Sequence, residues 1–111
     1  MTSTSAPRDA HETPSRQDWT FLTNHAHVLL CISADPEIRQ RDIARLVGIT
    51  ERAAQKIVSE LEAGGYLTRE RVGRRNRYRM NGDVPLRHPL ESTHRIGELI
   101  GVLRPKLRAP E

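Results

Sequence analysis

Two short segments with helical apolar spacing, separated by one glycine, place the strongest constraint on how this chain of 111 residues can fold. The first covers residues 42–47 and ends at Gly48, and the second begins at Thr50 and ends at Gly64-Gly65. Apolar side chains recur every three or four positions in both, at Ile43, Ala44, Leu46 and Val47 and then at Ala54, Ile57, Val58 and Leu61. This spacing is typical of amphipathic helices, and glycine commonly ends them. The pattern predicts a helix-turn-helix with Gly48 in the turn and Ala44 as the small residue where the helices touch.

A basic β-hairpin is predicted directly after the second helix. Residues 66–72 and 77–80 have the composition of strands, and the residues between them, Gly73-Arg74-Arg75-Asn76, have that of a turn. Six arginines and one acid lie in residues 64–80, so this segment carries +5 (6 − 1), whereas the whole chain carries +4. An arginine cluster can be a merely solvated face, but a clustered excess of one sign also favours an anionic partner.

The remaining segments divide the chain further. Residues 1–17 lack apolar periodicity and are predicted to be a disordered tail, and residues 24–33 are predicted to form a buried helix with Thr23 as its cap. Residues 18–80 form the predicted domain, and residues 81–89, with two prolines, form a connector. A last helix is predicted over 90–104. We expect the apolar side of this helix to pair with a second protomer, although it can also pack on its own domain. The residues concerned are Leu90, Ile96, Leu99, Ile100 and Leu103.

Several functional classes are disfavoured by what the chain lacks. It has no run of about 18 apolar residues and no secretion signal, so we expect a protein of the cytoplasm without a membrane span. The single cysteine, Cys31, cannot form an internal disulfide, and with His27 it supplies only two potential metal ligands, so a buried thiol is expected rather than a metal site. No catalytic constellation or cofactor motif is visible, and we predict neither an enzyme nor a cofactor.

The stretch Asp42–Thr50, the helix end Leu61–Leu67 and the arginine-bearing hairpin together resemble the small bacterial winged helix-turn-helix transcriptional regulators of the MarR and ArsR type. The resemblance covers about residues 19–80. It implies a mainly α fold with a small β-hairpin, a winged helix-turn-helix with a C-terminal dimerisation helix. It also implies a cytoplasmic, nucleoid-associated regulator whose recognition helix, 50–63, enters the major groove while the wing, 72–77, meets the minor groove or backbone. MarR-type regulators usually have longer terminal helices around a ligand pocket, so a small-molecule effector stays open here.

The chemistry of the outward residues agrees with this resemblance. Gln55 can pair with adenine and Arg52 with guanine, while the helix dipole at Thr50 favours a phosphate. Glu51 either accepts from cytosine or, as we prefer, complements the dipole of its own helix. The candidate DNA-binding residues are Thr50, Arg52, Gln55, Lys56, Ser59, Arg71, Arg74, Arg75, Asn76 and Arg77.

Sequence-specific binding of double-stranded DNA by a homodimer is therefore the predicted function. The main alternative is a winged helix that binds an acidic protein through its basic hairpin. RNA binding is a weaker alternative, because only 4% of the residues are aromatic and the hairpin offers few of them for stacking on bases.

Overall fold

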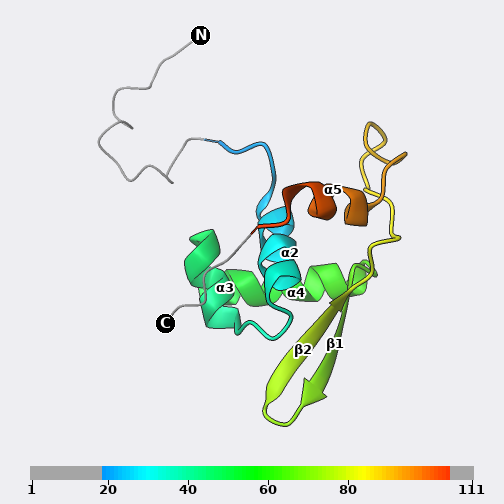
Figure 1. The fold of residues 1–111 in the computed structure, drawn as a ribbon. Helices are drawn as coiled ribbons and strands as arrows, with labels where there is room; N and C mark the ends of the chain where they lie inside the picture. The colour runs from blue at the N-terminus through cyan, green and yellow to red at the C-terminus, as the bar shows by residue number, and fades with distance from the viewer. Residues whose placement is uncertain (1–18, 106–111) are drawn as a thin grey trace, which may run out of the picture.

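A computed structural model describes residues 19–105 and shows three helices packed together, a hairpin and a further helix. In chain order the elements are α2 (Asn24–Ala34), α3 (Gln40–Val47), α4 (Glu51–Ala63), β1 (Leu67–Val72), β2 (Arg75–Met80) and α5 (Ile96–Leu103). The hairpin projects from one end of the helical body and α5 lies at the other (Figure 1). The predicted tail, 1–17, lies outside the described residues. No helix within 19–105 is both long and apolar enough to cross a membrane.

Local sequence signals explain where the helices begin and end. Thr23 and Thr50 cap α2 and α4, and the Thr50 hydroxyl accepts a hydrogen bond from the backbone N–H of Ala53 at 3.0 Å. Gly48 ends α3 with a φ of +89°, a left-handed conformation that glycine adopts without steric cost. The predicted helix-turn-helix and the helix before it are confirmed, although α2 ends one residue later than expected and α3 begins two residues earlier, at Gln40.

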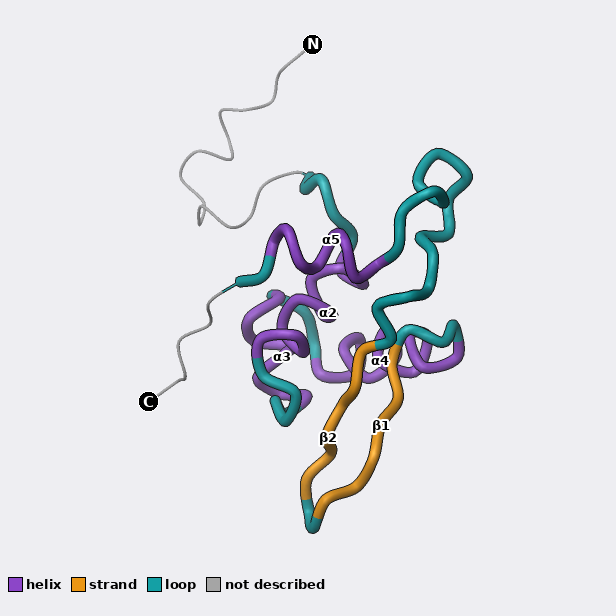
Figure 2. Tube along the Cα trace, turned by 45° about the vertical axis from the view of Figure 1, so that its right-hand side comes forward, coloured by secondary structure: helices purple, strands orange, loops and turns teal. Residues whose placement is uncertain are grey.

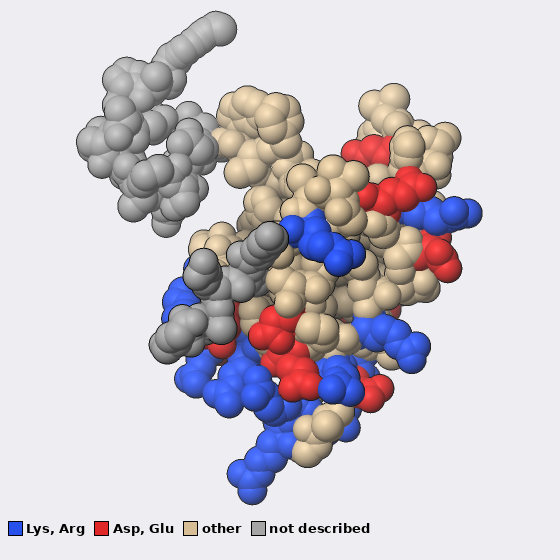
Figure 3. All heavy atoms as spheres, in the orientation of Figure 1, with Lys and Arg blue, Asp and Glu red and all other residues tan. Residues whose placement is uncertain are grey.

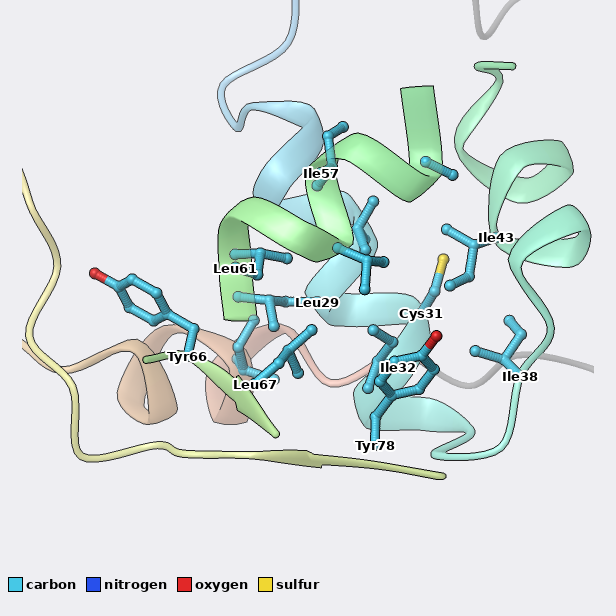
Figure 4. Close-up of a cluster of buried hydrophobic side chains, with 14 of the residues drawn as sticks. Leu29, Cys31, Ile32, Ile38, Ile43, Ile57, Leu61, Tyr66, Leu67 and Tyr78 are labelled. Atoms are coloured by element: carbon cyan, nitrogen blue, oxygen red, sulfur yellow. The ribbon is translucent and has the colours of Figure 1, made fainter. Parts of the chain in front are cut away.

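One core joins the three helices, the base of the hairpin and α5 (Figure 4). Ile43 and Ala44 of α3 are buried against the stripe of α4, and Cys31 lies among apolar side chains, where burial raises the pKa of its thiol. The hairpin contributes Leu67 and Tyr78 to the same core. The buried stripe of α4 is the predicted one: Ala54, Ile57, Val58 and Leu61.

The turn of the hairpin is shorter than predicted. Val72 pairs with Arg75 and Arg71 with Asn76, so the turn is only Gly73-Arg74, and Arg75 and Asn76 belong to β2. Gly73 has a φ of +64° and no described non-glycine residue has a positive φ, which suits a two-residue hairpin turn with glycine in its first position. The prediction of a four-residue turn is wrong because polar residues that suggested a turn are paired across the ladder.

The last helix begins six residues later than predicted, at Ile96; residues 90–93 form turns, and Arg95 forms an antiparallel bridge with Pro85. Before it, the chain folds back on the connector: Leu86 N–H donates to His94 O and Ile96 N–H donates to Val84 O, both at 2.9 Å. This pairing holds residues 94 and 95 extended, and Glu98 accepts from the backbone N–H of Arg95 as the helix starts. Helical periodicity between 90 and 95 was therefore overridden by a backbone pairing that the sequence does not reveal.

Candidate nucleic-acid interface

The outer face of α4 presents a polar surface that the rest of the described chain does not use. Arg52, Gln55, Lys56 and Ser59 are all exposed, and none of them forms a side-chain hydrogen bond or ion pair within residues 19–105. The opposite face of the same helix is fixed in the core by its apolar stripe. Rigid backbone with unsatisfied donors and acceptors on one side is what reading of base edges requires.

The start of α4 is exposed as well. The Thr50 hydroxyl is engaged as the cap of α4, which leaves its own O–H free to donate. Glu51 is exposed in the first turn and pairs with no described cation, so the carboxylate lies where the dipole of its own helix favours a negative charge. The N-terminus of α4 thus offers both a donor and an acceptor to a ligand.

The arginines of the hairpin divide between two faces. Paired residues share a face in an antiparallel ladder and alternate residues point to opposite faces, so Arg69 and Arg71 lie with Tyr78 and Asn76. Arg75, Arg77 and Arg79 lie on the other face with Glu70. The candidates Arg71, Asn76, Arg75 and Arg77 therefore do not form one flat surface, although all are near the tip.

Arg69 is committed to the fold. Its Nε and Nη2 donate to the two carboxylate oxygens of Glu62 in α4 at 2.9 and 2.8 Å, and the guanidinium lies 6.0 Å from the centre of the Tyr78 ring. The hydrogen bonds to Glu62 raise the pKa of Arg69. This two-point contact joins β1 to the last turns of α4.

Two candidate arginines are held by Glu37, in the loop between α2 and α3. Nε and Nη2 of Arg77 both donate to Oε2 of Glu37, at 3.2 and 2.9 Å, and Nη2 of Arg75 donates to the Glu37 backbone oxygen at 3.0 Å. The Tyr78 N–H also donates to Pro36 O at 2.8 Å. Sequence reasoning missed Glu37 because its partner lies 40 residues away and no local pattern marks the pair.

The tip itself is less constrained. Arg74 is exposed and its side chain bonds to no described residue, and Arg71 makes only a 3.4 Å contact with Gly73 O. Lysines and arginines gather over the lower part of the molecule, including the hairpin, with a group of acids among them (Figure 3). In both views of the backbone the hairpin tip points away from the helical body (Figures 1 and 2).

The residues predicted to mediate dimerisation have different environments. Ile96 and Ile100 are 4% and 3% exposed and pack into the core of their own domain. For these two residues the structure shows packing on their own domain, which was the second of the two alternatives. Leu99 is half-buried, whereas Leu90 and Leu103 are exposed. The exposure of three further apolar side chains was not predicted from the sequence: Trp19, Phe21 and Val102.

Comparisons with known proteins agree with this architecture. The model of the MarR family matches residues 20–77. Among solved structures, the chain is similar to the PcaV transcriptional regulator from Streptomyces coelicolor, crystallised with its natural ligand, with a TM-score of 0.50 and 25% sequence identity. The alignment covers 79% of this chain and 64% of the PcaV chain. No curated protein matches the chain in sequence.

Proposed function

The chain belongs to the MarR family of winged-helix transcriptional regulators, and we propose that it binds duplex DNA with α4 in the major groove and the hairpin tip on the adjacent minor groove or backbone. The observation that carries this proposal is the free polar face of α4, beside an arginine-tipped hairpin that projects from the same body. Regulation of chromosomal DNA would place the protein at the nucleoid.

Each surface has its own part in the proposed complex. Gln55 and Arg52 read base edges, with adenine and guanine as their partners, while Thr50, Lys56 and Ser59 meet phosphates. Arg74 is the leading hairpin contact because no described residue engages its side chain, and a narrow minor groove attracts arginine. The other proposed hairpin contacts are Arg71, Arg75, Asn76 and Arg77.

Dimerisation through the end of the molecule that holds α5 is part of the same proposal. Val102 is 83% exposed and Leu103 42% exposed, and the Trp19 and Phe21 rings pack edge to face, 5.0 Å apart, while both stay exposed. Exposed apolar side chains in one region favour association. A two-fold dimer would present two α4 helices about 34 Å apart to a palindromic site.

Binding to labelled genomic duplex fragments at several salt concentrations tests the proposal. If each protomer neutralises about four phosphates, log K should fall against log salt with a slope of about −3.6 per protomer. Arg74→Ala should weaken all sequences by a similar factor, and Gln55→Ala should change the preferred sequence. Arg87→Ala is the matched control, because Arg87 is an exposed arginine of the connector without a described partner.

Two results would contradict the proposal. Absence of binding to every duplex at low salt would favour the acidic protein partner instead. Equal losses for Arg74→Ala and Arg87→Ala would show that only total charge matters, and not the position of the hairpin. For dimerisation, sedimentation of Val102→Asp should shift toward the monomer, whereas Leu46→Asp, at an exposed apolar residue of α3, serves as the comparison.

A further inference from the structure

The ion pair between Glu37 and Arg77 of the hairpin is exposed to solvent and lies in a surface groove. Both side chains of the ion pair remain open to solvent, with Arg77 53% and Glu37 39% exposed. They lie in a groove of about 550 Å³ between the α2–α3 loop and the hairpin, which Glu70 and Arg79 also line. An exposed ion pair of this kind contributes little to folding, and it can exchange partners at low cost.

Arg77 is held less firmly than Arg69, the other paired arginine of the hairpin. Arg69 engages both oxygens of Glu62 and is 33% exposed, whereas both nitrogens of Arg77 converge on the single Oε2 of Glu37. Two other contacts between the loop and the hairpin use backbone oxygens of the loop as acceptors and not the Glu37 carboxylate. Tyr78 N–H to Pro36 O and Arg75 Nη2 to Glu37 O would both persist if Arg77 were released.

We propose that the Glu37 carboxylate competes with DNA phosphate for Arg77, so that the free protein carries a built-in autoinhibitory contact which duplex DNA must displace. This inference rests on the proposed function, because it assumes that the hairpin meets DNA. A duplex presents closely spaced phosphates and releases counterions when a cation binds, which a single carboxylate cannot match. Arg77 thus exchanges one anion for another, while the backbone contacts keep the hairpin in place.

Glu37→Gln, compared with Glu70→Gln, tests this competition in the full chain. Both substitutions remove one negative charge from the same groove, and Glu70 is the cross-strand neighbour of Arg77 but forms no described hydrogen bond with it. Binding to a labelled duplex selected with the wild-type protein would be measured by fluorescence anisotropy over a range of salt. We expect Glu37→Gln to tighten binding by about three- to fivefold, and Glu70→Gln by less than about twofold.

The salt dependence supplies a second readout. Because duplex DNA displaces Glu37 in the wild type as well, Arg77 neutralises a phosphate in both complexes, and the slope of log K against log salt should be the same in Glu37→Gln while the affinity rises. A slope that is steeper by about 0.9 per protomer in Glu37→Gln would mean that Glu37 keeps Arg77 in the wild-type complex, which would overturn the displacement. Arg77→Ala should cost less than about twofold in the wild type, but it should abolish the whole gain in the Glu37→Gln background. Thermal unfolding of every variant checks that the fold is retained, which the exposure of all three side chains favours.

The possible outcomes separate this inference from the function on which it rests. Equal tightening by Glu37→Gln and Glu70→Gln, weaker binding by Glu37→Gln, or equal costs of Arg77→Ala in both backgrounds would overturn the competition while wild-type DNA binding stands. A wild-type protein that binds no duplex would overturn both. Greater tightening by Glu37→Gln than by Glu70→Gln, with an unchanged slope and the coupling to Arg77, would support the inference.

Discussion

The hairpin and α5 are attached to the same helical body by different forces. Beyond its base at Leu67 and Tyr78, the hairpin is held by polar contacts, among them the half-buried ion pair of Arg69 with Glu62 and the exposed ion pair of Arg77 with Glu37. In α5, by contrast, Ile96 and Ile100 are buried, and Gly97 lies against the backbone of Gly82.

This difference shows how one small domain can have contacts that change with salt and ligand at one end and contacts that do not at the other. Surface ion pairs contribute about 0–1 kcal/mol and are screened by salt, so the outer hairpin can exchange its partners for phosphates. Burial of a large aliphatic side chain contributes about 1.5–3 kcal/mol and depends little on salt. The inner side of α5 is therefore a fixed part of the body, whereas the contacts of the outer hairpin can be exchanged.

The largest test of the comparison is the loss of a buried side chain from α5. We expect Ile100→Ala to lower the free energy of unfolding by about 2–4 kcal/mol, because it leaves a cavity beside α2. In the monomer, Val102→Ala, on the exposed side of the same helix, should change the free energy of unfolding by less than about 0.5 kcal/mol. Urea unfolding at low and at high protein concentration measures both variants, and a cost of Val102→Ala that grows with protein concentration would support the proposed dimer.

Substitution of two glycines of α5 by alanine gives a second test, because we expect one substitution to destabilise the fold and the other to stabilise it. A Cβ on Gly97 would lie 2.9 Å from the Gly82 carbonyl oxygen and 3.0 Å from its Cα, so Gly97→Ala should destabilise the fold by about 1–3 kcal/mol. A Cβ on Gly101 would meet nothing within 4 Å, so Gly101→Ala should stabilise the helix by up to about 1 kcal/mol. Thermal unfolding compares them. Destabilisation by Gly101→Ala would indicate that a second protomer approaches closely there.

Amide hydrogen exchange tests the polar attachment of the hairpin directly. Tyr78 N–H and Gly97 N–H each donate to a backbone oxygen across the join between an appendage and the body, at 2.8 and 2.9 Å. Glu37→Gln should speed exchange of the Tyr78 amide by about two- to fivefold and leave Gly97 unchanged, since only the first lies beside the ion pair. Equal changes at both amides would mean that the two ends are not held independently.

The smallest expected effect concerns pH and the polar start of α5. The hydrogen bond from His94, at 2.7 Å, and then that from the Arg95 backbone lower the pKa of Glu98 below its ordinary value of 4.5. A lowered pKa in the folded state adds stability above pH 4.5 that is lost as pH falls through the lower folded value. The urea midpoint of the wild type should therefore fall slightly more below pH 4.5 than that of Glu98→Gln. If the urea midpoints of both proteins fell equally with pH, the hydrogen bonds of Glu98 would make no contribution to stability.

Much of the fold was predictable because its signals are local. Threonine caps, the glycine after α3 and the stripe of α4 each act within a few residues, and the helices appear where those signals place them. The predictions failed at Arg75 and at residues 90–95, where backbone pairing with another segment outweighed the local pattern. Within the candidate site, the exposure of Gln55 and Arg52 followed from the helical period, because the buried stripe determines which residues point outward.

The sequence by itself determined that this chain has a helix-turn-helix with a basic hairpin after it, since periodicity, caps and charge clustering are properties of neighbouring residues. Only the tertiary structure decided which arginines are free and which are paired, and which apolar residues of α5 face inward. Glu37 meets Arg77 across 40 residues, and Ile96 packs into a core made mostly by earlier helices. Such contacts depend on how distant segments approach one another, and that information is not contained in any short stretch of the chain.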